Sequence, residues 1–108
     1  MTPAEKRLAL LEKMTAGGSS DPFHWYGLAL EYKGLGRDEE ALRTFERLRA
    51  LDPGYVPQYL LHAQVLVKLG RTGDARACLE AGIAAARQKG DAHALSELER
   101  DLGGSGRA

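Results

Sequence analysis

The chain has 108 residues, 44% of them hydrophobic, and its 15 basic side chains balance 15 acidic ones to a formal net charge of zero. A chain of this length forms one small domain with a modest core, which leaves little room for a deep pocket. The neutral balance and the lack of a basic stripe argue against nucleic acid and an anionic membrane surface as partners, and no apolar run approaches the roughly 20 residues that span a bilayer.

Helix signals, with no alternating strand pattern, follow one another along the chain. Thr2, followed by a proline and then a glutamate, is typical of a helix start and predicts an N-terminal helix over residues 3–15. The glycine- and serine-rich residues 16–20 form a flexible connection. Asp21, which precedes another proline, opens a second helix that ends at the turn glycine Gly36.

The third and fifth helices are expected to begin with capping side chains. Asp38 is placed to cap the third helix, which stops before Pro53. Thr72 is placed to cap the fifth, which runs to about Lys89. Both starts follow a glycine turn, so each pair of helices is expected to form a hairpin.

The remaining segments complete a chain of six helices. A fourth helix covers about residues 56–69, and a last helix is expected over residues 91–102. The glycine-rich residues 103–108 are expected to form a flexible tail. We therefore expect one helical domain over residues 1–102.

The sequence repeats itself at an offset of 34 residues. Large apolar residues also coincide, since Trp25 falls on Tyr59 and Phe45 on Leu79. Each copy is a helix, a glycine turn and a second helix, which must stack on a neighbour to bury its apolar face. The identical positions include Ala29 and Ala63, Leu35-Gly36-Arg37 and Leu69-Gly70-Arg71, and Ala41 and Ala75.

These residues match the pattern of a known family. The matching positions of the first copy are Trp25, Leu28, Ala29, Tyr32, Gly36, Ala41, Phe45 and Pro53. With them, residues 22–55 resemble a tetratricopeptide repeat (TPR), and residues 56–89 resemble a weaker second copy. In that copy His62 replaces a leucine and Arg87 stands at the proline place. The missing proline predicts that the fifth helix is longer than the third.

The resemblance implies an all-α fold, a right-handed α-solenoid of antiparallel helix hairpins. Two repeats form its centre, and the N-terminal and C-terminal helices cap its ends. Gly82 falls in the middle of a helix, where glycine costs about 1 kcal/mol relative to alanine. We therefore expect a close helix contact at Gly82.

The resemblance also implies a non-enzymatic adaptor or scaffold that binds a peptide or helix of another protein in a concave groove. Most side chains at the groove positions are apolar, as is typical of a contact site. Two alternatives stay open: terminal helices that cover part of the groove, and self-assembly into a homo-oligomer through the terminal helices or the apolar face. The groove residues implied by position are Phe23, Tyr26, Gly27, Leu30, Lys33, Gly34, Pro57, Leu60, Leu61, Gln64, Val67 and Lys68.

Two of these groove positions are glycines that the repeat pattern does not require. Gly27 and Gly34 lie on the expected concave face, where a missing side chain lets another backbone come close. We expect the neighbour to be a partner segment or a capping helix. Gly27→Leu is predicted to block this approach and to leave the fold intact.

Residues with catalytic or metal-binding potential are scattered. His24, His62 and His93 fall on three helices without a ligand pair one turn apart, so no metal or cofactor is predicted. Cys78 lies in mid-helix, where nothing supplies an oxyanion site, so no enzymatic activity is predicted. The single cysteine and the lack of a secretory signal favour the cytoplasm, and the excess of arginine over lysine favours a bacterial source.

Overall fold

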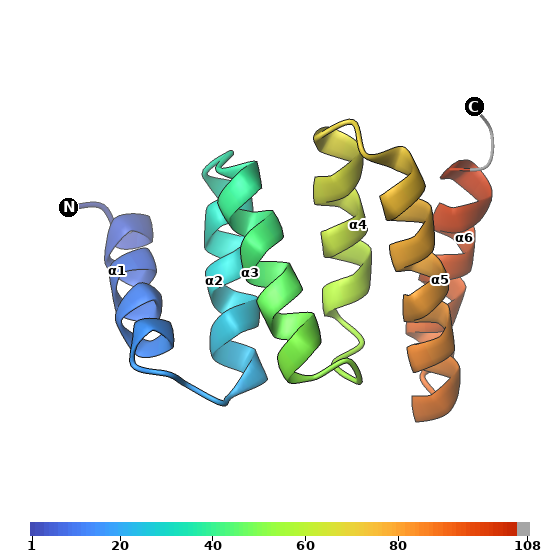
Figure 1. The fold of residues 1–108 in the computed structure, drawn as a ribbon, viewed down its shortest axis with the longest axis horizontal. Helices are drawn as coiled ribbons and strands as arrows, with labels where there is room; N and C mark the ends of the chain where they lie inside the picture. Colours follow the sequence, from blue (N-terminus) through green and yellow to red (C-terminus); the bar gives the residue numbers. More distant parts are fainter. Residues whose placement is uncertain (106–108) are drawn as a thin grey trace. The chain divides into compact units, whose positions relative to one another are not determined.

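The computed structural model describes the chain from Met1 to Ser105, and these residues form helices without any strand (Figure 1). The all-α fold class is therefore confirmed. The helices are α1 (Pro3–Ala16), α2 (Pro22–Gly34), α3 (Asp38–Leu51), α4 (Gln58–Lys68), α5 (Thr72–Lys89) and α6 (Ala92–Ser105).

The residues group into two compact units, and each is described by itself. The first unit runs from Met1 to Asp52 and contains α1, α2 and α3. The second begins at Pro53 and contains α4, α5 and α6. The single domain expected over residues 1–102 stays a prediction.

The starts of α3 and α5 differ from the predicted caps by one residue. Arg37 and Arg71 occupy the N-cap positions, and neither side chain makes a capping hydrogen bond. Asp38 and Thr72 are already the first helical residues. The predicted capping roles of Asp38 and Thr72 are therefore wrong, although both helices exist where they were expected.

Glycine turns explain this shift. Gly36 and Gly70 have positive φ angles of 74° and 77°, a conformation that glycine adopts without strain. The next residue then closes the preceding helix, because the Arg37 N–H donates to the Tyr32 carbonyl oxygen at 2.9 Å. The Arg37 side chain pairs with Glu40 in the first turn of α3, where a capping hydroxyl would otherwise act.

The lengths of the last two helices test two further predictions. α5 has 18 residues and α3 has 14, so the longer fifth helix is confirmed.

α6 continues through Gly103 and Gly104 to Ser105, so the flexible tail predicted from residue 103 is wrong for these three residues. The buried Leu98 and the half-buried Leu102 hold this end of α6 in place despite the glycines. Residues 106–108 of the predicted tail lie outside the described residues.

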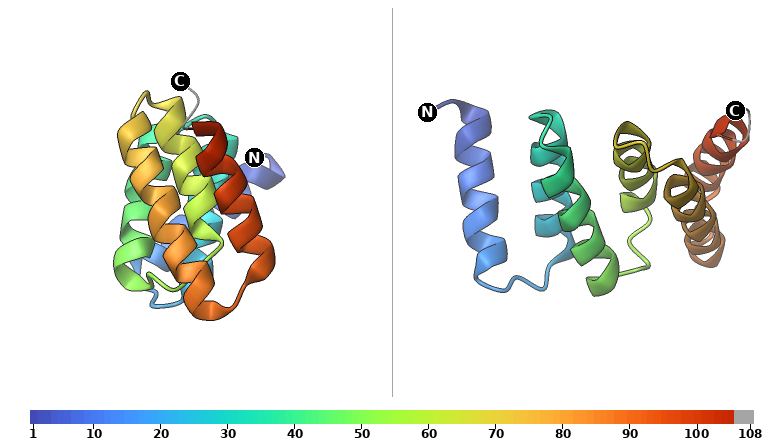
Figure 2. Two further views of the ribbon diagram at one scale, coloured as in Figure 1. Left: turned by 90° about the vertical axis from the view of Figure 1, so that its right-hand side faces the viewer. Right: turned by 45° about the horizontal axis from the view of Figure 1, so that its top comes forward.

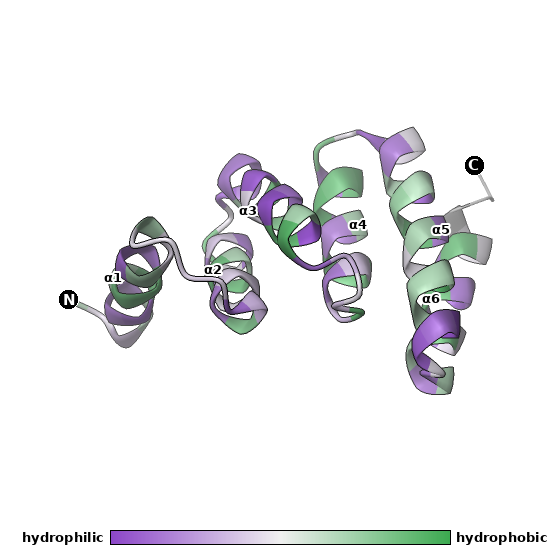
Figure 3. Cartoon of the chain, turned by 60° about the horizontal axis from the view of Figure 1, so that its bottom comes forward, coloured by the Kyte–Doolittle hydropathy of each residue, from purple (hydrophilic) through white to green (hydrophobic). Residues whose placement is uncertain are grey.

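In the first unit, α2 and α3 form an antiparallel hairpin, and α1 packs against α2 (Figure 1). The buried alanines Ala29 and Ala41 provide the small surfaces that allow close approach. Phe45 is among the largest fully buried side chains. The ribbon of α3 has long hydrophilic stretches in Figure 3, and three of its four acidic residues stand in the first turn, at the positive end of the helix dipole.

In the second unit, α4 and α5 form the other hairpin, and α6 packs side by side with α5 (Figure 2). A Cβ atom added to Gly82 would lie 2.6 Å from Cβ of Tyr59 and 3.2 Å from Cδ2 of Leu98. The close contact predicted for Gly82 is therefore confirmed. It involves both neighbouring helices, because Tyr59 belongs to α4 and Leu98 to α6.

Candidate protein-binding surfaces

An exposed stripe on α2 contains four of the predicted groove residues of the first repeat. Phe23, Gly27, Leu30 and Gly34 follow one another at spacings of four, three and four residues, which places them on one face of a helix. The side chain of Phe23 is 66% exposed and that of Leu30 is 36% exposed. A Cβ atom at Gly34 would meet open space. We call these four residues the α2 stripe.

Helix α1 borders the α2 stripe. A Cβ atom at Gly27 would lie 3.4 Å from Cδ2 of Leu11. The Arg7 guanidinium Nε donates to Oε1 of Glu31 at 2.7 Å and ties α1 to α2 along the same edge. Of the two neighbours expected at Gly27, the one present in this unit is therefore the terminal helix. Tyr26 and Lys33, which flank the stripe, are half-buried.

In the second unit, two predicted groove residues line a hollow with α6. Gln64 and Val67 of α4 face Arg100, Asp101 and Gly104 across a space of about 370 Å³. Val67 is 50% exposed. No pattern in the sequence marks the three α6 residues, because only the packing of α6 beside α4 brings them here.

The other predicted residues of the second repeat differ in their exposure. Leu60 and Leu61 are half-buried, and Lys68 at the end of α4 is exposed. Pro57 is exposed at the N-cap position and precedes the first residue of α4. Val67 is therefore the predicted groove residue of this unit with a large, exposed apolar side chain.

A polar network fixes the three helices of the first unit. The Tyr32 hydroxyl donates to Oε2 of Glu12 at 2.6 Å. Burial, and then Glu12, raises the pKa of Tyr32 to about 12. Arg37 lies over the Tyr32 ring, with 4.8 Å from its guanidinium carbon to the ring centroid, and binds both carboxylate oxygens of Glu40 at 2.6 Å. The hydrogen bond from Arg37 lowers the pKa of Glu40. These contacts hold α2 against α1 and α3.

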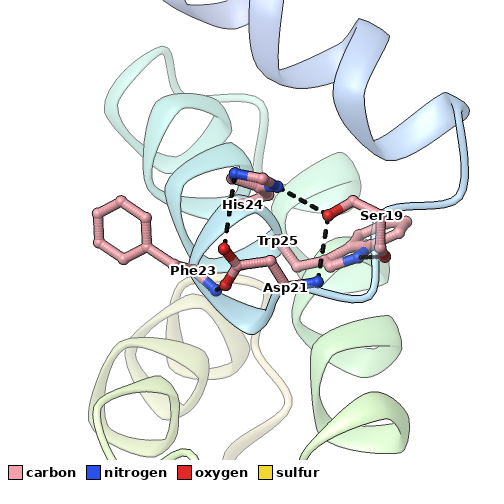
Figure 4. Close-up of polar contacts among 5 residues, drawn as sticks. All are labelled: Ser19, Asp21, Phe23, His24 and Trp25. Atoms are coloured by element: carbon pink, nitrogen blue, oxygen red, sulfur yellow. Dashed lines mark hydrogen bonds and ion pairs between the residues drawn. The ribbon is translucent and has the colours of Figure 1, made fainter.

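A serine, a histidine and an aspartate meet at the start of α2 (Figure 4). Ser19 Oγ lies 2.7 Å from Nδ1 of His24, and Nε2 of His24 lies 3.7 Å from Oδ2 of Asp21. These residue types serve nucleophilic catalysis elsewhere, but such chemistry needs N–H groups that stabilise an oxyanion. Here the N–H groups of Phe23 and His24 both donate to Asp21. The cluster therefore acts as a helix cap.

The same cluster orders the connection between α1 and α2. The Trp25 indole N–H donates to the Ser19 carbonyl oxygen at 2.8 Å, and the Asp21 N–H donates to Ser19 Oγ at 3.2 Å. From the sequence, His24 was considered only as a candidate metal ligand and was rejected, so its role in this cluster was missed. A Ser-x-Asp-Pro segment before a helix, with a histidine three residues after the aspartate, is the signal that could have shown it.

The described residues were also compared with what metal and membrane sites require. No group of three histidine, cysteine, aspartate or glutamate side chains in this part of the chain is arranged to hold a metal ion. Cys78 is buried, and its Sγ lies 3.5 Å from the Tyr59 carbonyl oxygen. From Met1 to Ser105, none of the helices combines the length and the apolar character that a membrane span requires.

Comparison with known proteins gives a consistent match. The family model for the tetratricopeptide repeat matches residues 32–98. The chain is also similar to a tetratricopeptide repeat domain protein from Salinibacter ruber, with 36% identity to both of its structures. The crystal structure has a TM-score of 0.77 over 81% of this chain and 98% of that one. The solution structure has a TM-score of 0.76 over 79% and 86%.

A further solved structure extends the likeness over nearly the whole chain. A protein from Bordetella parapertussis is 26% identical, with a TM-score of 0.80, and the match covers 99% of this chain and 90% of that one. None of the curated proteins matches the chain. The relatives from Salinibacter ruber and Bordetella parapertussis are bacterial proteins known by their structures.

Proposed function

Because the chain belongs to the tetratricopeptide repeat family, we propose that it is a non-enzymatic adaptor that binds a peptide or helix of another protein. The fold of this family generally mediates protein–protein interaction. The proposed contact surfaces are the twelve predicted groove residues, centred on the α2 stripe in the first unit and on Val67 in the second. The buried, single Cys78 supports a reducing cytoplasm, and the bacterial relatives support a bacterial source.

The exposure of Phe23 is the observation that carries this proposal. A phenylalanine that is 66% exposed on a helix has no structural role for most of its surface. Burying such a side chain fully contributes roughly 1.5–3 kcal/mol, and Leu30 lies two turns further along the same stripe. Aromatic side chains are also enriched at protein interfaces. A partner that covers Phe23 and Leu30 gains binding free energy from the burial of each side chain.

A pair of double variants tests the α2 stripe. Phe23→Ser with Leu30→Ser removes its two large side chains, and Leu10→Ser with Leu35→Ser removes two leucines that are 59% and 46% exposed but lie outside it. The wild-type chain captures partners from a lysate of its source cells, and each captured protein is purified and titrated by calorimetry against the three chains. We expect the stripe variant to bind at least about tenfold more weakly, and the control within about twofold of wild type.

The two variants also separate a specific surface from a general loss of apolar area. Circular dichroism shows whether each variant keeps its helices. Equal weakening by both double variants would contradict a role for the α2 stripe. Unchanged affinity of the folded stripe variant for every captured protein would also reject the assignment.

A further inference from the structure

The face of α2 opposite the α2 stripe borders a second hollow. Trp25 and Tyr32 lie two turns apart on one side of α2, about half a turn around the helix from Phe23 and Leu30. With α3 they border an open surface depression of about 250 Å³. Because it faces away from the stripe, this hollow is independent of the proposed groove. It is lined by Trp25, Tyr32, Glu40, Arg43, Thr44 and Arg47.

The aromatic floor of this hollow is held in place on both sides. The Trp25 indole N–H donates to Ser19, and the Tyr32 hydroxyl donates to Glu12. The guanidinium carbon of Arg47 lies 5.3 Å from the centroid of the Trp25 ring, within the range of a cation–π contact. Both rings are therefore fixed surfaces.

The charges around the hollow are not balanced. Its carboxylate, Glu40, is already paired with Arg37. Arg43 and Arg47 are exposed, and neither forms an ion pair with a residue of the described chain. They stand one turn apart on α3, so their guanidinium groups project from the same face. The hollow therefore presents two exposed arginines that have no ion-pair partner among the described residues, and one of them, Arg47, lies over the ring of Trp25.

Two acidic residues of α3 could in principle have neutralised Arg43. Glu39 lies four residues before it and Glu46 three residues after it, spacings that permit ion pairs on a helix. Both are exposed, and neither pairs with Arg43. Arg43 also lies near Glu40 and helps to lower the pKa of that carboxyl, but both carboxylate oxygens of Glu40 already accept hydrogen bonds from Arg37.

The size of the hollow indicates what kind of partner fits. Small-molecule and cofactor sites occupy roughly 300–1,000 Å³ and enclose most of the ligand. A hollow of about 250 Å³ takes one or two side chains. Its occupant is therefore a segment of a protein. Nucleic acid fits poorly, because Arg47 stacks on the Trp25 face where a base would stack.

We propose that this hollow binds an acidic segment of another protein, whose carboxylates pair with Arg43 and Arg47. Arginine suits this role, because its planar guanidinium donates two parallel hydrogen bonds to one carboxylate. The exposed position makes each pair modest in strength and sensitive to salt. The site therefore contributes attraction and orientation, whereas the α2 stripe contributes apolar burial.

The single tryptophan of the chain makes the proposal directly measurable. Trp25 lies in the hollow, so its indole N–H resonance and its fluorescence report on this site alone. The 108-residue chain is titrated with an eight-residue peptide of alternating glutamate and glycine, and with the same peptide carrying glutamine for glutamate. We expect the glutamate peptide to shift the Trp25 signal in a saturable way, more weakly as salt rises, and the glutamine peptide to leave it unchanged.

Variants at the two arginines complete the test. Arg43→Gln with Arg47→Gln is expected to weaken the glutamate peptide about tenfold, at about two- to fivefold for each arginine. Arg76→Gln with Arg87→Gln, which removes two exposed arginines of α5, is expected to leave the affinity within about twofold. The proposal is overturned if the glutamine peptide binds equally well, or if the folded Arg43/Arg47 variant keeps full affinity. It is also overturned if no peptide moves the Trp25 signal at millimolar concentration, or if a single-stranded oligonucleotide of equal charge binds more tightly than the glutamate peptide.

Discussion

Tyr32 connects the three helices of the first unit through one hydroxyl group and one ring face. Its hydroxyl reaches Glu12 of α1, and its ring carries the guanidinium of Arg37, which in turn binds Glu40 of α3. The TPR pattern has tyrosine at this position. The contribution of its hydroxyl to stability can be measured separately from that of the ring.

Tyr32→Phe keeps the ring and removes the hydroxyl. We expect the free energy of unfolding at neutral pH to fall by about 1–2 kcal/mol, because Glu12 loses a donor in a half-buried position. The folded-state pKa of about 12 lies above the ordinary value of 10.0. The contribution of the hydroxyl is therefore complete below pH 10 and is lost as the pH rises from 10 to 12.

Denaturant unfolding of both proteins across this pH range checks the Tyr32 prediction. The difference between wild type and variant should stay constant from pH 7 to about 10 and then shrink. Because both proteins contain the same other titrating groups, their effects cancel in the difference. A difference that persists unchanged at pH 12 would show that folding does not raise the pKa of Tyr32, and no difference at neutral pH would show that the hydroxyl contributes nothing.

Gly82 is the position of α5 where a side chain is least tolerable. A Cβ atom there would lie 2.6 Å from Cβ and 2.9 Å from Cγ of Tyr59. Gly82→Ala is therefore expected to lower the free energy of unfolding by roughly 1–3 kcal/mol, because overpacking outweighs the gain in helix propensity of about 1 kcal/mol. Gly73→Ala in the same helix meets open space and is expected to be neutral or stabilising. Thermal unfolding of both variants measures these changes in stability. A Gly82→Ala protein that is more stable than wild type would contradict the close contact between Gly82 and Tyr59.

At the scale of elements, the sequence predicted the helices well and their starts less well. The repeat of Leu-Gly-Arg placed the two glycine turns, because a left-handed glycine ends a helix through local backbone bonds alone. The caps assigned to Asp38 and Thr72 were wrong because the glycine turn already fixes the backbone path one residue earlier. Local propensity also made Gly103 a tail residue, whereas packing of α6 on α5 keeps it helical.

The candidate surfaces were only partly predictable for the same reason. Helical periodicity alone places Phe23 and Leu30 on one stripe. The contributions of Arg100 and Asp101 depend on how α6 lies beside α4, which no local pattern specifies. The lack of an ion pair at Arg43 and Arg47 could likewise not be predicted from the sequence, since spacing alone would have paired Arg43 with an acidic neighbour.

The docking of α1 depends on Gly27. Leu11 already fills the space next to it, so Gly27→Leu is now expected to push α1 off α2 and not to leave the fold intact. The expected cost is roughly 1–3 kcal/mol, as for other overpacked contacts. Native-state hydrogen exchange should show loss of protection in α1 with α3 still protected, because α1 packs on α2 and α3 keeps its own packing on α2.

Gly34→Leu provides the matched control for α1 docking. Gly34 is a glycine of the same stripe, but its Cβ position meets open space. This variant should keep the exchange protection of α1. If Gly27→Leu leaves α1 as well protected as Gly34→Leu does, the contact with Leu11 does not hold α1 in place.

For the molecule as a whole, the outward faces of the terminal helices bear on self-assembly. Leu10 is the large hydrophobic side chain of α1 that is exposed. Lys6 and Lys13 are exposed on the same side of the helix. In α6, His93 is 88% exposed to solvent on its side chain and lies 2.8 Å from the Glu97 carboxylate. End-to-end stacking would bury these charges, which costs free energy that a single leucine does not offset.

We therefore expect the 108-residue chain to be a monomer of 11.7 kDa across a wide concentration range. Light scattering behind a size-exclusion column, from micromolar to millimolar protein, measures the mass directly. A mass that rises with concentration would favour the alternative of self-assembly, and Leu10→Lys and Phe23→Lys would then locate the interface. Leu10→Lys would restore the monomer if α1 mediates the association, and Phe23→Lys would do so if copies meet through the α2 stripe. A constant mass, together with binding that Phe23→Ser and Leu30→Ser abolish, would leave partner recognition as the role of that stripe.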